Sequence, residues 1–231
     1  MKIDIIVPIY NERENLLNLI LNFKKKLNFN YKILLCYDRN DKNFIFYKKI
    51  ENQFKEIQLV KNNYSGPCEA IKLGIKKSKT LYKIIYPSDD IKNYNVLNLM
   101  SKLSYHKYDV IVASRFIKGG SMKHCPFIKN ILVRFVSKSL NLLKIIPVKD
   151  ASNGFRLFSK KYLDSVIIES THGFSYSLEL LIKAKIQKKK IKEVPASWEE
   201  RLKGKSNFKL LKWTPYYLKW YLFGLFHIFK K

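Results

Sequence analysis

Adjacent carboxylates follow a mainly apolar segment near the middle of the sequence. Residues 81–86 have the composition of a buried strand, and Ser88, Asp89 and Asp90 come directly after it. Mg²⁺ and Mn²⁺ prefer carboxylate, phosphate and water oxygens, and they usually take only one or two carboxylates from a protein. One aspartate together with a bound diphosphate would therefore complete a metal site. The alternative is a solvated turn in which an aspartate caps the next helix, and the three residues alone favour that alternative.

Two further aspartates, Asp38 and Asp41, close another apolar segment at residues 31–37. A carboxylate in that position can accept hydrogen bonds from a nucleobase or a ribose. It can equally satisfy backbone N–H groups of its own turn, which is a common role of Asp and Asn in loops. Spacing alone does not separate these two roles.

Arginines are rare among the basic residues, and three of them, Arg115, Arg134 and Arg156, stand in otherwise lysine-rich sequence. The planar guanidinium group binds phosphate oxygens in pairs, which a lysine ammonium group does not. These side chains could neutralise a departing diphosphate or hold a phosphorylated acceptor. For any one of them alone, a surface salt bridge is the simpler interpretation. A basic loop at residues 201–206 could also close over phosphates, or belong to a flexible tail.

The charge of the chain is strongly unbalanced. Its 231 residues include 45 Lys and Arg against 18 Asp and Glu, a formal net charge of +27. Such an excess favours acidic partners such as nucleic acid, anionic lipid or phosphorylated substrates. The alternative is that most of the extra lysines line a solvated surface, because net charge constrains partners rather than fold.

Cysteines and apolar stretches limit the expected environment. Cys36, Cys68 and Cys125 lie far apart, so neither a zinc motif nor a disulfide framework is indicated, which fits a reducing cytoplasm. The N-terminus lacks the pattern of a signal peptide, and no run of about 18 or more apolar residues predicts a transmembrane helix. The apolar fraction of 47% predicts one packed domain, with room for a short appendage.

Strand-like and helix-like segments alternate through the first half of the chain. The expected strands are 3–9, 31–37, 57–60, 81–86 and 109–113, with a helix after Asn11 and others at 44–55, 69–77 and 94–104. This alternation predicts an α/β fold with a mostly parallel central sheet flanked by helices. Ligands of such sheets bind beyond the carboxyl ends of the strands. Residues 8–12, 38–41, 88–90 and 114–115 should therefore converge on one crevice.

The second half of the chain is less regular. The expected elements are a helix at 127–143, a polar loop at 150–156, a helix at 174–185 and an extended segment at 191–198. From Phe208 onward the chain is aromatic and basic, and Pro215 is expected to split it. Residues 218–229 are too short to span a membrane comfortably. They are typical of an amphipathic helix in the headgroup region, or of a terminal helix packed on the domain or on a second subunit.

Taken in order, these segments resemble the motifs of family 2 glycosyltransferases with the GT-A fold. Within that family, they are most similar to the branch of dolichyl-phosphate mannose synthases and other polyprenyl-phosphate sugar transferases. We therefore expect a GT-A domain at 1–207 and a basic aromatic segment at 208–231. The segments that carry the resemblance are VPIYNE (7–12), YDRND (37–41), SGPCEAIKLG (65–74), YPSDD (86–90), ASRFIKGG (113–120), DASNGFR (150–156), EVP (193–195) and RLKGKS (201–206).

On the donor side, the resemblance implies a nucleobase pocket lined by Pro8, Tyr10 and Glu12, with Asp38 in contact with the base. The family's Asp-Asp-Gly-Ser turn is replaced here by the sequence of residues 37–40. The expected donor is therefore a GDP- or UDP-sugar, with the choice between the two nucleotides left open.

The resemblance also implies a metal site. Asp90, with help from Asp89, would bind Mg²⁺ or Mn²⁺ and the donor diphosphate, and Arg201 would contact that diphosphate. Two positions depart from the family pattern. Ser88 stands where the first aspartate of the DxD motif belongs, and Asn207 replaces a lysine, for which Lys205 or Lys209 would have to substitute.

On the acceptor side, the resemblance implies that Arg115 and Arg134 meet the acceptor phosphate. Lys129 stands where the family often has another arginine. Asp150 and Arg156 would shape the same side of the site.

The implied reaction is transfer of the sugar to a polyprenyl phosphate with inversion at the anomeric carbon. A phosphate oxygen is already anionic at neutral pH, so this acceptor requires no strong general base. A glycan hydroxyl in surface polysaccharide synthesis is the alternative acceptor, and it would need a carboxylate base within hydrogen-bond reach. Asp89 and Asp150 are the candidates for that base.

The implied location is cytoplasmic, on the inner face of the membrane, with oligomeric state left open. A nucleic-acid-binding module is a rival hypothesis, but the basic residues are spread along the chain without a nucleic-acid motif, so no nucleic-acid partner is expected. A nucleotidyltransferase would need a glycine-rich, basic loop after the first strand, which residues 8–12 do not supply. A non-catalytic nucleotide-binding member of the family is the third rival, motivated by Ser88 and Asn207.

Overall fold

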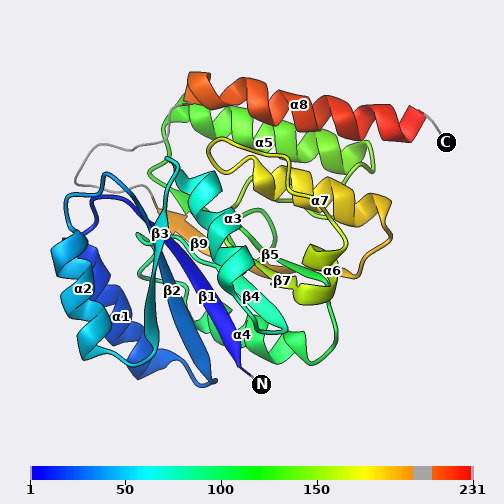
Figure 1. Ribbon diagram of the computed structural model, residues 1–231. Helices are drawn as coiled ribbons and strands as arrows, with labels where there is room; N and C mark the ends of the chain where they lie inside the picture. Colours follow the sequence, from blue (N-terminus) through cyan, green and yellow to red (C-terminus); the bar gives the residue numbers. More distant parts are fainter. Residues whose placement is uncertain (1, 200–209, 230–231) are drawn as a thin grey trace.

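The computed structural model describes residues 2–199 and 210–229, and a seven-stranded sheet lies at its centre (Figure 1). Six strands run parallel to one another, and only β7 is antiparallel to its neighbours. The prediction of a mostly parallel sheet is therefore confirmed. In spatial order the strands are β3 (Ile57–Asn62), β2 (Tyr31–Asp38), β1 (Ile3–Ile9), β4 (Tyr82–Ile85), β7 (Arg156–Ser159), β5 (Val110–Ser114) and β8 (Ile191–Pro195).

Helices cover both faces of this sheet and enclose two separate apolar clusters (Figure 1). Strand β1 shows why: Ile3, Ile5 and Val7 belong to one cluster and Ile6 to the other, so the strand is buried on both faces, as parallel strands usually are. One face carries α1 (Glu14–Lys26), α2 (Phe44–Gln53) and α4 (Tyr94–Ser104), and the other carries α3 (Pro67–Lys77), α5 (Phe127–Leu142), α6 (Lys160–Asp164), α7 (Tyr176–Ile186) and α8 (Leu210–Phe229).

Strand β7 was not anticipated from the sequence, where its first residue was placed in a polar loop. Its four residues insert antiparallel between β4 and β5, with Arg156 opposite Ile85 and Val112. Because β7 runs against the other strands, it begins at the edge where they end. The loop before it, residues 150–155, therefore lies at the carboxyl edge of the sheet. A second, two-stranded sheet pairs β6 (Ser121–Lys123) with β9 (Ser197–Glu199).

The prediction that Pro215 splits the C-terminal segment is wrong. Helix α8 is continuous and contains Pro215. Packing against the domain compensates for the backbone hydrogen bond that a proline removes. Trp220 is buried and donates from Nε1 to Ser170 Oγ at 2.8 Å, and Tyr221 Oη donates to Ser139 Oγ of α5 at 3.1 Å. Within residues 2–199 and 210–229, no helix is both long and apolar enough to cross a membrane.

A buried ion pair holds the loop before β7. Arg115, directly after β5, binds Asp150 in a bidentate manner, with Nε 2.7 Å from Oδ2 and Nη2 2.8 Å from Oδ1. The same carboxylate accepts the backbone N–H groups of Arg115, Ser152 and Asn153. Burial alone would raise the pKa of Asp150, but Arg115 reverses the effect and the pKa is lowered. The loop is thus organised around one fully buried carboxylate.

Arg156 holds the same loop from beneath. Its side chain is fully buried, and its Nε and Nη2 each donate at 2.7 Å to the carbonyl oxygens of Asn153 and Ala151. Nη1 donates to the carbonyl of Ser177 at the start of α7. Burial lowers the pKa of Arg156 to about 10. This arginine satisfies backbone carbonyls in the interior.

Replacing Asp150 by asparagine should destabilise the protein by about 3–5 kcal/mol, because Arg115 would remain buried without its counter-charge. Equilibrium denaturation in urea measures this difference. The folded-state pKa of Asp150 is lowered, so its stabilising effect is present above the unfolded carboxyl pKa of about 3.9 and is lost as pH falls through the folded value.

Asp164→Asn is the matched control, since Asp164 is exposed and forms a surface ion pair with Lys160 one helical turn earlier. We expect that variant to lie within about 0.5 kcal/mol of the wild type. Equal denaturation midpoints for the two variants would contradict the structural role of the buried pair.

Candidate functional site

The loop after β1 is held at the carboxyl edge by Asp41. Its Oδ2 accepts the backbone N–H of Asn11 at 2.8 Å and the hydroxyl of Tyr47 at 3.1 Å. The Tyr47 hydroxyl in turn accepts the backbone N–H of Glu12 at 3.1 Å. Asn11 has a left-handed φ of 51°, which asparagine tolerates well. Asp41 therefore shapes the predicted nucleobase loop, a role that the turn pattern of residues 38–41 did not reveal.

The predicted nucleobase residues differ in exposure. Tyr10 is 51% exposed, Pro8 is half-buried, and Glu12 is buried. Asp38 is also buried, and its two oxygens each accept one hydrogen bond of 2.8 Å, from Asn62 Nδ2 and from the backbone N–H of Gly66. A carboxylate has about four acceptor sites, so Asp38 retains capacity for a ligand. In the structure it joins the ends of β2 and β3 to the start of α3.

Asp90 lies in the turn that leads into α4. Its Oδ1 accepts the backbone N–H groups of Lys92 and Asn93 at 3.0 Å each, and its Oδ2 accepts Asn93 Nδ2. These bonds close the turn itself. Helix α4 begins at Tyr94 with Asn93 at its N-cap position and no side-chain cap hydrogen bond, so Asp90 does not form the helix cap that the sequence offered as the alternative to a metal site. Burial raises the pKa of Asp90. A cation beside this carboxylate would relieve that cost, so its role in the turn and metal binding are compatible.

The donor set fits a divalent metal only if a ligand contributes oxygens. Among residues 2–199 and 210–229, no group of three or more His, Cys, Asp or Glu side chains could hold a metal ion. Ser88 is buried and carries no carboxylate. The carboxylates of this turn are those of Asp90 and of Asp89, which is exposed. One or two carboxylates with a diphosphate match the usual protein contribution to a Mg²⁺ site.

Two residues that the sequence did not single out fix Asp90. Tyr86 is fully buried, donates to the carbonyl oxygen of Asp90 at 2.9 Å, and packs edge-on against Phe155 with ring centres 4.9 Å apart. Asn93 donates to the carbonyl of Ser197 at 2.6 Å and accepts its N–H at 2.9 Å. Tyr86 thus links Asp90 to the 150–155 loop, and Asn93 links it to β9.

Aromatic rings bring the predicted acceptor cations together. The Cζ atoms of Arg115 and Arg134 lie 5.1 and 4.8 Å from the centre of the Phe116 ring. Lys129 Nζ lies 4.7 Å from the centre of the Trp198 ring. Arg134 is exposed, with Nε 2.7 Å from Asn130 Oδ1, whereas Arg115 is buried by its pairing with Asp150. Arg134 and Lys129 are therefore better placed than Arg115 to meet an incoming phosphate.

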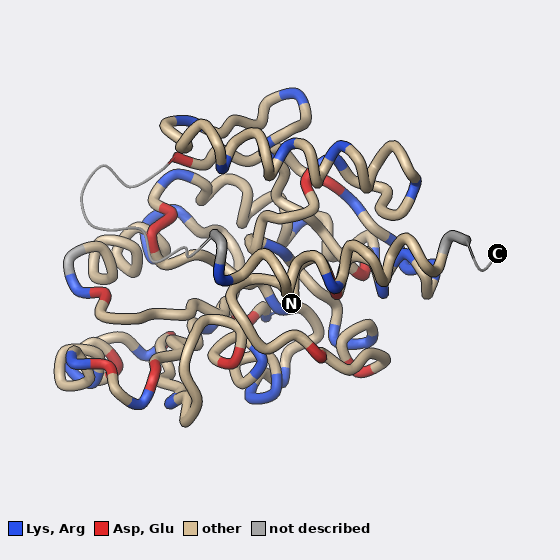
Figure 2. Tube along the Cα trace, turned by 90° about the horizontal axis from the view of Figure 1, so that it is seen from above, with Lys and Arg blue, Asp and Glu red and all other residues tan. Residues whose placement is uncertain are grey.

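One predicted site residue, Arg156, is not at this surface. It is fully buried on backbone carbonyls, so it can act on the site only by positioning the loop above it. Arg201 lies outside the described residues, as do Asn207, Lys205 and Lys209. Lysine and arginine residues are otherwise distributed throughout the described chain rather than gathered at one edge (Figure 2).

Comparison with curated proteins finds dolichyl-phosphate sugar transferases. The sequence is 27% identical over 230 residues to the dolichol-phosphate mannosyltransferase of Pyrococcus furiosus, covering 95% of this chain and 64% of that protein. It is 27% identical over 218 residues to the dolichyl-phosphate beta-glucosyltransferase of Dictyostelium discoideum, covering 86% of this chain and 66% of that protein. The chain therefore spans somewhat less than two thirds of the length of these relatives.

Solved structures share the fold. Glucosyl-3-phosphoglycerate synthase of Mycobacterium tuberculosis, in complex with Mn²⁺, UDP and phosphoglyceric acid, superimposes with a TM-score of 0.69 at 13% identity. The alignment covers 96% of this chain and 78% of that one. Its complex with Mn²⁺, UDP and glucosyl-3-phosphoglycerate gives a TM-score of 0.71 at 11% identity, covering 96% and 79%. This similarity confirms the predicted GT-A fold.

The family profile matches most of the chain. Residues 4–167 match the profile described as glycosyl transferase family 2. The matched region includes β1, the turns that carry Asp38 and Asp90, and the Arg115–Asp150 pair. The chain belongs to glycosyl transferase family 2.

Proposed function

We propose that the protein transfers a sugar from a nucleotide-diphospho-sugar to a polyprenyl phosphate, with inversion at the anomeric carbon. The observation that carries the proposal is the placement of Asp90 and of the Phe116–Arg134 contact around the same 150–155 loop. A carboxylate for the donor metal and cations for an acceptor phosphate thus share one edge of the sheet. The names of the Pyrococcus and Dictyostelium relatives support a dolichyl-type phosphate as the acceptor class.

The donor half consists of the loop after β1, Asp38 and Asp90. We propose a GDP- or UDP-sugar as the donor, with its base beside Pro8, Tyr10 and Asp38. Asp90, with Asp89, would hold Mg²⁺ or Mn²⁺ against the diphosphate. The ion would supply positive charge that stabilises the departing nucleoside diphosphate. The Mn²⁺ and UDP in the mycobacterial synthase support this assignment of the metal class.

The acceptor half favours a phosphate over a hydroxyl. A phosphate oxygen forms the new bond to the anomeric carbon while the bond to the donor diphosphate breaks, and no proton has to be removed. A hydroxyl acceptor would need a basic carboxylate, but Asp150 is fully buried and binds Arg115 through both oxygens. Its lowered pKa makes it a weak base. Asp89 is the remaining candidate for that alternative.

We also propose that the protein acts as a peripheral enzyme on the cytoplasmic face of a membrane. Helices α5 and α8 lie side by side (Figure 1), and each carries exposed apolar side chains at four-residue spacing. Such stripes are typical of helices that lie in the headgroup region. On α5 they are Phe127, Ile131 and Phe135, and on α8 they are Leu218, Leu222 and Phe226, with exposed fractions between 50% and 77%.

Asp90→Asn should reduce sugar transfer by about 100-fold or more while leaving the fold intact, because it removes the metal-binding charge and keeps most of the turn. Asp90→Ala should do the same, with an additional loss of about 1 kcal/mol of stability, because the hydrogen bonds to Lys92 and Asn93 in the turn disappear. Transfer to a short polyprenyl phosphate measures activity, and circular dichroism measures folding. Thermal stabilisation by GDP- and UDP-sugars, with and without Mn²⁺, tests the donor directly.

Asp164→Asn is the control and should keep wild-type activity, since Asp164 lies on α6, which follows β7 at the edge of the sheet opposite the predicted site. Full activity of Asp90→Asn would overturn the site assignment, and the absence of stabilisation by any nucleotide-sugar would count against the enzyme. Because burial raises the pKa of Asp90, Mn²⁺ affinity should weaken as pH falls, beginning at a higher pH than for an ordinary aspartate near 3.9.

Phe135→Glu and Leu222→Glu should each weaken binding to anionic phospholipid vesicles by about tenfold, because each removes an apolar side chain from the proposed membrane face and adds negative charge. Co-sedimentation with vesicles measures the effect. Ile45→Glu is the matched control, since Ile45 is 73% exposed on α2, on the other face of the sheet. Equal loss in all three variants would mean that general charge, rather than this face, governs vesicle binding.

A further inference from the structure

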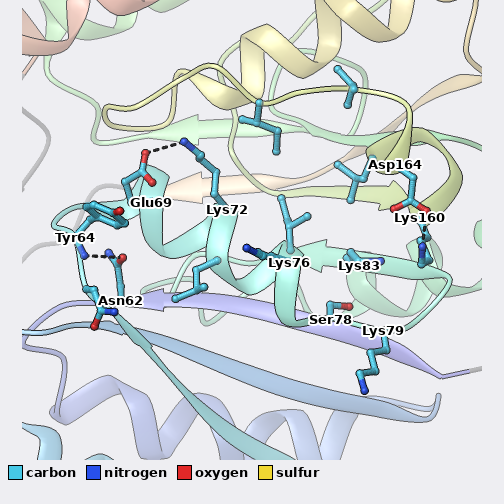
Figure 3. Close-up of a pocket in the computed structure, with 16 residues that line it drawn as sticks. Asn62, Tyr64, Glu69, Lys72, Lys76, Ser78, Lys79, Lys83, Lys160 and Asp164 are labelled. Atoms are coloured by element: carbon cyan, nitrogen blue, oxygen red, sulfur yellow. Dashed lines mark hydrogen bonds and ion pairs between the residues drawn. The ribbon is translucent and has the colours of Figure 1, made fainter.

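A groove with a volume of about 710 Å³ runs along α3, apart from the predicted catalytic residues (Figure 3). Its walls are α3, the start of β4, α6 and the segment that follows α6. This volume lies within the range of about 300–1,000 Å³ that is typical of small-molecule sites. The groove meets the predicted donor site only at Asn62, whose amide donates to Asp38.

The groove is basic. Its lining contains five lysines, Lys72, Lys76, Lys79, Lys83 and Lys160, against two carboxylates, Glu69 and Asp164. Both carboxylates already have partners, because Glu69 pairs with Lys72 and Asp164 pairs with Lys160. In the part of the chain that the structure describes, Lys76, Lys79 and Lys83 make no ion pair with a carboxylate. Figure 3 shows Lys76 and Lys83 between the two pairs.

Lys83 distinguishes this cluster from ordinary surface lysines. It lies on β4, is only 2% exposed, and its Nζ donates to the carbonyl oxygen of Thr80 at 2.7 Å. An ammonium group has three donors, so two remain for a ligand. Burial, followed by the nearby charge of Lys160, lowers the pKa of Lys83. An anion in the groove would offset both effects.

The groove is also lined by apolar side chains. They are Leu73 and Ile75 of α3, Leu163 of α6, and Val166 and Ile168 of the following segment. A ligand that contacts both the lysines and these side chains needs a compact anionic group and an apolar body. Carboxylate clusters that would attract a cation are absent from the lining residues, where lysines outnumber Asp and Glu.

We propose that this groove is a second ligand site, which binds the phosphate group of a small amphiphilic phosphate ester through Lys76 and Lys83. The apolar body of the ligand packs on Leu73, Ile75 and Leu163. Such a phosphate can come from a soluble phosphorylated metabolite or from a lipid headgroup. The site needs neither the metal nor Asp90, so it is independent of the proposed transfer reaction.

Calorimetric titration with hexyl phosphate in EDTA tests the proposal, using the full chain with Asp90→Asn to remove the predicted donor site. Lys76→Glu should weaken binding by about tenfold, since it reverses one of the three unpaired charges. Lys77→Glu is the matched control, because Lys77 is the next residue of α3, is exposed, and does not line the groove. It should bind hexyl phosphate as its parent does.

Lys83→Met probes the buried ammonium group, with circular dichroism to establish that the variant folds. If that variant does not fold, the comparison of Lys76→Glu with Lys77→Glu decides. Vesicles containing dihexadecyl phosphate separate the two sources: retention by vesicles that depends on Lys76 indicates a lipid headgroup, and binding of hexyl phosphate alone indicates a soluble ester. Undetectable binding of both probes, or equal affinity of Lys76→Glu and Lys77→Glu, overturns the proposal.

Discussion

The buried ion pair between Arg115 and Asp150 constrains everything on the acceptor side of the sheet. Residues 150–155 belong to no strand or helix, so side chains must satisfy their backbone groups. Asp150 accepts three backbone N–H groups in addition to the guanidinium of Arg115, and Arg156 takes the loop carbonyls from below. A buried pair of this kind adds little stability over apolar packing, but it specifies one conformation. The guanidinium group of Arg115 also lies over the ring of Phe116, which in turn contacts Arg134.

For Asp90, a structural role in its turn and a role in metal binding first stood as alternatives, and the structure makes the two roles compatible. One oxygen of Asp90 accepts the backbone N–H groups of Lys92 and Asn93 in the turn before α4, and the Asn93 side chain links the other oxygen to β9. These bonds fix the carboxylate before any ligand arrives, so its orientation does not have to be selected during binding. Burial then leaves the carboxylate with an electrostatic cost that a cation would relieve. The hydrogen bonds of this turn therefore hold Asp90 ready for the proposed metal.

The sequence predicted the parallel part of the fold well because buried strands and amphipathic helices leave strong local patterns. It missed β7 because four residues are too few for a periodic pattern. The position of β7 between β4 and β5 also depends on contacts between residues that are far apart in the sequence. It misjudged Pro215, because a local rule cannot include the packing of Trp220. The strand-end rule placed Asp38 and Asp90, whereas Tyr86 and Asn93 resemble ordinary core and cap residues until their partners are known.

Net charge shows the same division between local and long-range information. The excess of basic residues favours anionic partners, but it does not locate a site in which an anion would be bound and desolvated. Exposed lysines attract anions weakly because solvent screens them, whereas buried cations interact strongly and are costly when unpaired. The structure separates buried cations by their partners. Arg115 has Asp150 and Arg156 has carbonyl oxygens, while Lys83 has a single carbonyl in an open groove, so the electrostatic demand for a ligand is greatest there.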